Sequence, residues 1–292
     1  MPPPLPASDP GALLHAVLQA NETTADSRLR TILAAGIKHL HAFALEVDLT
    51  PAELQVGLDF LVEIGKATGA EKHEGILLAD ILGLATLVQL RDARHAVAAG
   101  GTEPALVGPF WRANQPLRSH GSCISSATTP GAKLEVRGRV VDLEGNPIQG
   151  ARVETWQASP DGMYENQDPD QEDMNLRGRF ETDAQGRFSF TSVRPSGYPV
   201  PIDGPCGRLL AAQRRKVMRP AHLHFIVLAD GFKCLATQFF DIQDPNAYED
   251  VVFGAVGSLL RTFEPDGEGG YRLDIELKLE AGQARLPHCP LP

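Results

Sequence analysis

The stretch "RPAHLHFIVLADGFKCLATQFFDI", residues 219–242, decides the fold of the second half of the chain. Its apolar and polar residues nearly alternate, and the run Phe225–Leu228 favours a strand. Asp230-Gly231 is a turn signal, so the stretch predicts a pair of strands. Residues i and i+2 of a strand point to the same face, so His222 and His224 project side by side. Two such imidazoles are either ordinary half-exposed strand residues or half of a metal site.

Three other stretches carry strand patterns. Residues 133–158, "KLEVRGRVVDLEGNPIQGARVETWQA", predict two alternating strands around a Gly-Asn-Pro turn. Residues 178–193 predict a hairpin-like unit that turns at Asp183–Gly186, and residues 271–280 close the chain as a strand. Several short strands with regular turn signals indicate an antiparallel sandwich or barrel.

The first part of the chain has helical periodicity instead. Residues 28–47 space their apolar residues by three and four. In residues 48–65, Thr50 is the expected N-cap, with Pro51 at the first helical position and Glu53 three residues after the cap. Residues 73–97 predict a third helix, which is more apolar all round and is therefore expected to be more buried.

Together these patterns predict an α+β protein in which an N-terminal helical segment packs on a mostly antiparallel β-sandwich. We expect a flexible Pro-rich leader over residues 1–11, a helical domain over residues 12–104 and a β-sandwich domain over residues 105–292.

Composition excludes several functional classes. The chain has 292 residues, of which 42% are hydrophobic and 22% charged, as in ordinary globular proteins. No apolar run reaches the roughly 18 residues of a membrane helix, no signal-peptide pattern begins the chain, and a net charge of -10 argues against nucleic acid. The cysteines are scattered without a C-x-x-C pair, which favours reduced thiols and a cytoplasmic location: Cys123, Cys206, Cys234 and Cys289.

Two tyrosines lie in unusual loops. Tyr164 lies in "PDGMYENQDPD", residues 160–170, and Tyr198 lies in "RPSGYPVPIDGP", residues 194–205. Tyrosines in such loops commonly cover the end of a sandwich. They also offer phenolate oxygen, which suits a ferric ion, whereas zinc takes a third histidine or a carboxylate, and a ferrous oxygenase takes two histidines and a carboxylate.

The order of these residues resembles the intradiol ring-cleaving dioxygenases, which include the catechol, chlorocatechol and hydroxyquinol 1,2-dioxygenases. The resemblance rests on Tyr164, on "SGYPVP" with Tyr198, and on "RPAHLHF" with His222 and His224. It runs from about residue 25 to residue 280, through the further matches "LVGPFW" at 106–111, "GRVVDLEGNPIQGARVETWQA" at 138–158, "DGPCGRLL" at 203–210 and "TQFFD" at 237–241.

The resemblance implies a non-haem Fe(III) ion, one per subunit, with four protein ligands: Tyr164, Tyr198, His222 and His224. In such enzymes the tyrosinate at the position of Tyr198 leaves the metal when the substrate binds and takes up a substrate proton. Arg219 would stabilise charge on the ring, and Gln238 would hydrogen-bond near the metal-bound hydroxide. A buried arginine needs an anionic partner. For Arg214 and Arg215, in the same basic segment, we expect surface positions.

The resemblance also implies a substrate pocket lined by Leu77, Asp80, Leu106, Val107, Gly108, Pro109, Phe110, Val200, Pro201 and Cys206. Asp80 is the only charged residue of "ILLADILGL", residues 76–84, and a buried carboxylate needs a partner. That partner is a backbone amide, an arginine or a substrate hydroxyl. Because this stretch looks more like hydroxyquinol dioxygenases, the expected substrates are hydroxyquinol and O2, with catechol or chlorocatechol as the alternative.

Other interpretations remain open at this point. A zinc hydrolase would use His222 and His224 with a third ligand. Residues 138–156 also resemble transthyretin-like sandwiches, which serve as binding modules. The family resemblance further implies a homodimer formed through the helical domain, which can hold a lipid between its helices.

Overall fold

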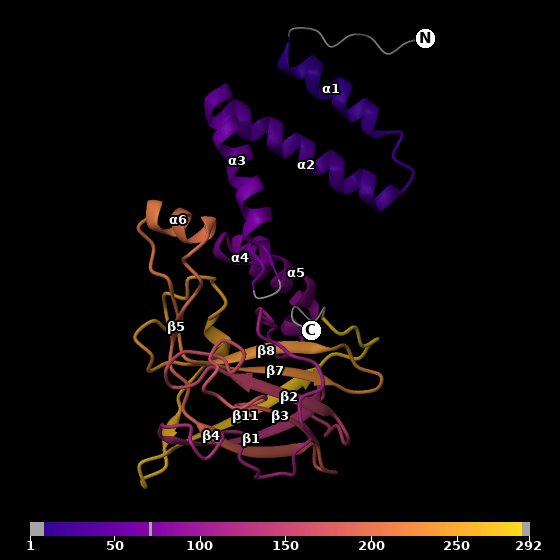
Figure 1. Cartoon of the computed structure of the whole chain (residues 1–292). Helices are drawn as coiled ribbons and strands as arrows, with labels where there is room; N and C mark the ends of the chain where they lie inside the picture. Colours follow the sequence, from indigo (N-terminus) through magenta and orange to yellow (C-terminus); the bar gives the residue numbers. More distant parts are fainter. Residues whose placement is uncertain (1–8, 70–71, 288–292) are drawn as a thin grey trace. The chain divides into compact units, whose positions relative to one another are not determined.

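A computed structural model describes residues 9–69 and 72–287 of the chain (Figure 1). The chain divides into two compact units, residues 1–62 and residues 63–292. The division falls within helix α3 (Pro51–Ala67), whereas the sequence predicted a boundary at residues 104/105.

The first unit contains helices α1 (Pro10–Asn21), α2 (Ser27–Glu46) and the greater part of α3. Helix α1 begins inside the predicted leader, of which residues 1–8 lie outside the described part. The predicted start of α3 is confirmed. The Glu53 amide donates to the Thr50 hydroxyl at 3.3 Å, and the Thr50 amide donates to the Glu53 carboxylate at 2.9 Å.

The second unit begins with two helices where the sequence predicted one. Helices α4 (Glu74–Ile81) and α5 (Leu84–Ala98) are separated at Gly83, whose φ of 69° lies in the left-handed region that favours glycine. The expectation of a buried helix is wrong for α5, because none of its residues is buried and Leu87 is 54% exposed. No helix in the described ranges is both long enough and apolar enough to cross a membrane.

Two sheets form the body of the second unit. The site sheet has the strand order β3-β2-β7-β8-β9, and the back sheet has the order β10-β11-β1-β4. The strands are β1 (Lys133–Asp142), β2 (Arg152–Gln157), β3 (Arg177–Glu181), β4 (Arg187–Val193), β7 (His222–Leu228), β8 (Leu235–Asp241), β9 (Leu260–Arg261), β10 (Glu264–Pro265) and β11 (Tyr271–Leu279). A separate two-stranded ribbon pairs β5 (Tyr198–Pro199) with β6 (Met218–Arg219). The predicted α+β class with a mostly antiparallel sandwich is confirmed, although β1 pairs with β11, and β8 with β9, in parallel.

Strand pairing agrees with the sequence prediction only in part, because β1 and β2, expected on either side of one turn, lie in different sheets. The predicted pair in residues 219–242 is confirmed, since β7 and β8 are antiparallel neighbours. The hairpin predicted for residues 178–193 is wrong, because β3 pairs with β2 in the site sheet and β4 pairs with β1 in the back sheet. Alternation identifies a strand that is buried on one face, but it does not identify the sheet to which the strand belongs.

Strand β7 is buried on both faces. Leu223, Phe225 and Val227 enter the core between the two sheets, where side chains of both sheets interdigitate. His222 and His224 alternate with them and therefore project from the other face of the site sheet. Phe110, Trp111, Trp156, Ala158, Tyr164, Tyr198 and Ile226 form a second cluster on that face. The histidines are thus fully enclosed rather than half-exposed.

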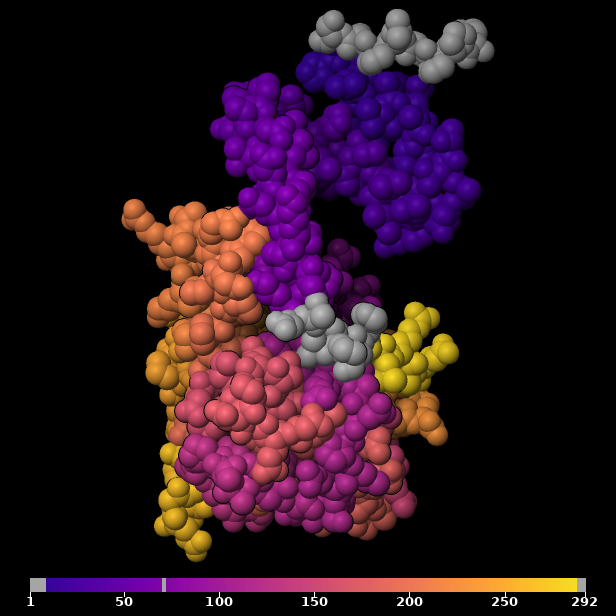
Figure 2. All heavy atoms as spheres, viewed as in Figure 1, coloured from indigo at the N-terminus to yellow at the C-terminus, as the bar shows by residue number. Residues whose placement is uncertain are grey.

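Helix α6 (Pro205–Ala212; orange in Figure 2) lies at the surface of the second unit. It buries Cys206 and Leu210 on its inner side. The sequence analysis did not predict this helix, because the Gly- and Pro-rich composition before it indicates a loop.

The close approach of β1 to β4 gives a test of this fold. A Cβ atom added at Gly138 would lie 2.1 Å from the ring of Phe188, so Gly138→Ala must displace a buried ring. We expect the substitution to lower the free energy of unfolding by about 1–3 kcal/mol in chemical denaturation followed by circular dichroism. Gly257→Ala is the matched control, because nothing lies within 4 Å of its added Cβ. Equal stability of both variants would contradict the described register.

Candidate metal centre and active site

Four side chains converge on one point beside the site sheet. His222 and His224 come from β7, Tyr198 comes from β5, and Tyr164 comes from the loop that follows β2. The two histidine Nε2 atoms lie 3.1 Å apart. The Tyr164 Oη lies 3.0 Å from His224 Nε2 and 3.2 Å from the Tyr198 Oη. The structure therefore brings together all four residues that the sequence predicted as metal ligands.

Packing and hydrogen bonds hold Tyr164 in this position. Its ring stacks on Phe110, with ring centroids 4.3 Å apart, and its amide donates to the Gln167 side chain at 3.0 Å. The next residue, Glu165, forms a buried ion pair of 2.6 Å with Arg177, which also donates to the Phe110 carbonyl. This network ties the tyrosine loop to β3 and to the segment around Phe110.

Tyr198 is positioned by the ribbon of β5 and β6, in which it pairs directly with Arg219. The preceding residue must be small, because a Cβ atom at Gly197 would lie 2.6 Å from the carbonyl oxygen of Arg219. The ribbon thus brings the tyrosine predicted to accept a substrate proton and the predicted catalytic arginine to the same place.

Electrostatics make the histidines neutral and available as ligands. Burial, together with the nearby Arg219 charge, lowers the pKa of His222 to about 3, and burial with the neighbouring His222 lowers the pKa of His224 well below its ordinary value. His222 Nδ1 lies 2.7 Å from the carbonyl of Pro220 and donates to it, which leaves the lone pair on Nε2. His224 is held by a ring stack on Trp156, with centroids 4.5 Å apart.

The phenols indicate what such a centre would hold. Burial first, and then the neighbouring Tyr198, raise the pKa of Tyr164 well above its ordinary value. A tyrosinate therefore requires a strongly charged cation beside it. The oxygen and nitrogen separations of 3.0–3.2 Å are those of ligands that share one ion at about 2 Å from each. The donor set of two neutral imidazoles and two phenols fits a hard, highly charged metal ion.

The alternative of a zinc hydrolase is not supported by the residues around His222 and His224. Within residues 9–69 and 72–287, no group of three or more His, Cys, Asp or Glu side chains is arranged to hold a metal ion. The two histidines therefore have tyrosines as their companions, and not the third histidine or carboxylate that a hydrolytic zinc site uses.

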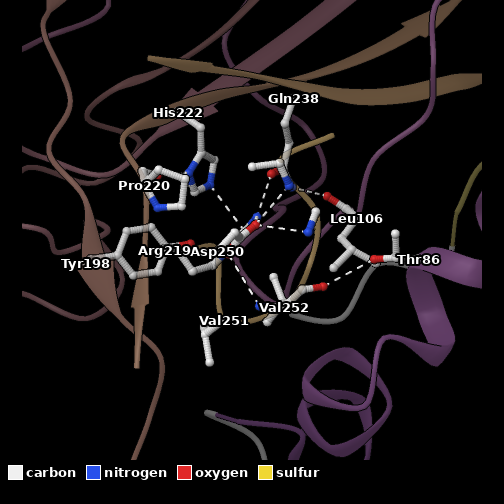
Figure 3. A network of polar contacts seen from close by, with 12 residues as sticks. Thr86, Leu106, Tyr198, Arg219, Pro220, His222, Gln238, Asp250, Val251 and Val252 are labelled. Atoms are coloured by element: carbon white, nitrogen blue, oxygen red, sulfur yellow. Dashed lines mark hydrogen bonds and ion pairs between the residues drawn. The ribbon is translucent and has the colours of Figure 1, made fainter. Parts of the chain in front are cut away.

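Arg219 has the anionic partner that its burial demands. It is 4% exposed, and its Nε and Nη2 atoms each lie 3.1 Å from an oxygen of Asp250 (Figure 3). Burial by itself would raise the pKa of Asp250, but the Arg219 charge holds it below its ordinary value. Arg219 Nη2 also donates to Gln238 at 2.8 Å, and Gln238 donates to the carbonyl of Leu106. The sequence analysis missed Asp250, which lies 31 residues from its partner in a loop without a recognisable motif.

A cavity of about 830 Å³ opens in front of Tyr198 and Arg219. Eight of the predicted pocket residues line it: Leu77, Asp80, Leu106, Gly108, Pro109, Phe110, Val200 and Pro201. Val107 and Cys206 are not among the lining residues. Cys206 is fully buried, and its amide donates to the Glu74 carboxylate at 2.9 Å. Lining residues that the sequence analysis missed include Glu74, Ile76, Met163, Asn166 and Val252.

Asp80 lies in the last turn of α4 and is 7% exposed. Burial raises its pKa to about 7; the positive charge of Arg219 acts against this shift and the negative charge of Asp250 adds to it. Among the described residues, none donates a hydrogen bond to the Asp80 carboxylate. Neither a backbone amide nor an arginine among the described residues thus donates to Asp80. The third partner considered was a substrate hydroxyl, and Asp80 lines the cavity.

Arg215 differs from its predicted surface position. It is half-buried and donates to the carbonyls of Ile81 and Val251, each at 2.6 Å, while its guanidinium lies over the Phe253 ring. It therefore fastens the end of α4 to the loop that carries Asp250. Arg214 is exposed, as expected.

The sandwich, the tyrosine and histidine cluster and the adjoining cavity are typical of a metal-dependent enzyme that acts on a small molecule. Comparison with known proteins specifies it further. A dioxygenase family model matches residues 106–278, and a model of the catechol dioxygenase N terminus matches residues 26–100. The chain belongs to the intradiol ring-cleavage dioxygenase family, whose members use non-haem iron. This membership sets aside the zinc-hydrolase and transthyretin-like interpretations.

Similar proteins cover nearly the whole chain. A 6-chlorohydroxyquinol 1,2-dioxygenase of Cupriavidus pinatubonensis is 38% identical over 91% of this chain and 96% of its own length. A hydroxyquinol 1,2-dioxygenase of Rhizobium sp. is 40% identical over 82% of this chain and 80% of its own length. The crystal structure of hydroxyquinol 1,2-dioxygenase from Pseudomonas putida DLL-E4 has a TM-score of 0.86 at 36% identity, covering 94% of this chain and 99% of that one.

Replacement of the tyrosines and histidines tests the metal centre directly. We expect the wild type to be red-brown, because tyrosinate-to-ferric charge transfer absorbs visible light. Tyr164→Phe and His224→Ala should lose iron and colour together, since each removes one of the four predicted ligands. Tyr198→Phe should keep part of its iron, shift the visible band and lose most activity. Metal analysis and absorption spectra provide the measurement.

Tyr248→Phe is the matched control, because Tyr248 is 77% exposed and is not part of the cluster. It should retain the iron and the spectrum of the wild type. A Tyr164→Phe variant with undiminished iron content and an unchanged visible band would refute the assignment of Tyr164 as a ligand.

Proposed function

We propose that this enzyme cleaves hydroxyquinol with O2 between its adjacent hydroxylated carbons, giving 3-hydroxy-cis,cis-muconate and, by tautomerisation, maleylacetate. One observation carries this choice within the family. The Asp80 carboxylate is buried and lines the cavity, and no described residue donates a hydrogen bond to it. A third ring hydroxyl would supply the missing donor. The hydroxyquinol and 6-chlorohydroxyquinol dioxygenases among its relatives support the same substrate class.

The proposed roles of the residues follow from their surroundings. Tyr164, Tyr198, His222 and His224 would hold a non-haem Fe(III) ion, which would supply the Lewis-acid chemistry that makes the ring reactive toward dioxygen. Tyr198 lines the cavity and would accept a proton from a ring hydroxyl at its Oη. Arg219 also lines the cavity and would stabilise negative charge on the ring, since a guanidinium keeps its proton. Gln238 would hold Arg219 and the segment around Leu106 in place.

Exclusion of water is the role of the apolar wall. Leu77, Leu106, Pro109, Phe110 and Val200 surround the site of the ring with hydrocarbon, which strengthens every charge interaction inside the cavity. Catechol or a chlorocatechol fits the same wall, and it is the alternative substrate class. It would leave Asp80 without a hydrogen-bond donor.

The helical segment has a separate proposed role, which is the formation of a homodimer. Helix α2 buries none of its residues within the chain, although it is rich in apolar side chains. Leu40 on α2, and Val56 and Leu61 on α3, are each more than half exposed. Contact with the helices of a second chain would remove such side chains from water.

Substrate preference tests the proposed role of Asp80. The wild type should prefer hydroxyquinol over catechol, and Asp80→Leu should reverse or abolish this preference. A buried polar contact is worth about 1–3 kcal/mol, which corresponds to roughly one to two orders of magnitude in the ratio of kcat/KM values. Asp80→Asn, which keeps an acceptor oxygen and the size of the side chain, should lie between the two. If the wild type prefers catechol, or the ratio stays constant in Asp80→Leu, Asp80 does not select the substrate.

A further inference from the structure

The hydrogen bonds of Arg219 to carboxylate and amide oxygens use two of its three side-chain nitrogens. Its Nε donates to Asp250, and its Nη2 donates to both Asp250 and Gln238. A guanidinium has five N–H groups, so these contacts occupy the three on Nε and Nη2. The remaining nitrogen, Nη1, lies 3.3 Å from His222 Nε2. The lone pair of this Nε2 atom is the one proposed to bind the metal. When that lone pair is taken, no described residue accepts from Nη1.

The Asp250 carboxylate is itself held rigidly. It is 7% exposed and accepts hydrogen bonds from the amides of Gly254 at 3.0 Å and Ala255 at 3.1 Å, in addition to the two from Arg219. A longer contact of 3.4 Å comes from the amide of Val252. These amides belong to residues 252–255, which follow Asp250 closely in the chain. Figure 3 shows Val252 beside Asp250. The side chain of Asp250 is therefore held in a fixed position beside the guanidinium of Arg219.

The loop around Asp250 is also fastened to helix α4, which lines the cavity, and to the neighbouring helix α5. The Thr86 hydroxyl of α5 donates to the carbonyl of Val252 at 3.2 Å, and Val252 lines the cavity. Arg215 joins the carbonyl of Val251 to that of Ile81, which follows Asp80 directly. The loop that carries Asp250 thus holds Arg219 of β6 directly, and it is joined through Arg215 to the end of α4, which carries Asp80.

We propose that Asp250 is a positioning residue for ring cleavage, which acts through Arg219 by fixing the plane of the guanidinium so that Nη1 is directed to the bound ring. This inference rests on the proposed function, because the ring to which Arg219 is directed is the substrate proposed above. A carboxylate that accepts from both Nε and Nη2 fixes the plane of the guanidinium. A neutral side chain at residue 250 would hold this plane less firmly.

The test compares Asp250→Asn with the wild type in iron content, kcat and KM for hydroxyquinol. Loss of the charge should reduce kcat by about 10²-fold, since a misplacement of about 1 Å costs this much. Iron per chain and the visible band should remain, because Asp250 is not a proposed ligand. Asp250→Glu keeps the negative charge and should have a kcat between those of the wild type and Asp250→Asn. If Asp250→Asn does not fold, Asp250→Glu replaces it in the comparison.

Two comparisons separate positioning from general stability. Asp241→Asn is the matched control, because Asp241 is also buried and paired with an arginine, Arg194, but neither residue lines the cavity. It should lower the thermal midpoint without a comparable loss of kcat. In an Arg219→Lys background, Asp250→Asn should cost less than about threefold further, since residues that act as a unit are not additive.

The outcomes distinguish this inference from the proposed function. A wild type that cleaves neither hydroxyquinol nor catechol overturns the proposed function. A wild type that cleaves its substrate while Asp250→Asn retains its kcat overturns the positioning role alone. Full additivity of Asp250→Asn and Arg219→Lys would overturn it as well.

Discussion

Burial of both faces of strand β7 is the constraint on which the rest of the site depends. One face completes the core between the two sheets, so the strand cannot slip by a residue without replacing Leu223, Phe225 and Val227 in that core by neighbouring side chains, including the two histidines. The other face therefore presents His222 and His224 at fixed positions, enclosed by an aromatic cluster. A sheet core sets the geometry of the two imidazoles more rigidly than a loop could.

A buried charged group destabilises the fold unless an opposite charge lies beside it. Arg219 brings a buried positive charge next to two neutral imidazoles, and burial disfavours that charge unless an anion is present. Asp250 supplies one anion within the protein. Burial raises the pKa of the Tyr164 phenol well above its ordinary value, so this phenol stays protonated unless a cation joins it. A non-haem ferric ion with tyrosinate ligands would balance the cluster, which agrees with the chemistry of the family to which the chain belongs.

Sequence reasoning succeeded where the signal is local or carried by the resemblance. The strand pair around Asp230-Gly231, the cap at Thr50 and the approach of all four predicted ligand residues agree with the structure. It failed where the outcome depends on distant partners. The pairing of β3 and β4 with different sheets is decided by the whole sandwich, and Asp250 is recognisable only once the fold brings it to Arg219. The break at Gly83 was missed because the apolar run continues through it.

Cleavage in the presence of ¹⁸O₂ tests the central claim most directly, since it reports the bond that breaks and the source of both oxygen atoms. The purified wild-type enzyme, given hydroxyquinol, should form a ring-opened dicarboxylate cut between the two adjacent hydroxyl-bearing carbons. Mass spectrometry of the product, quenched before exchange with water, should show both labelled atoms incorporated. A semialdehyde product, from cleavage outside the diol, or a product that carries no label, would contradict the account.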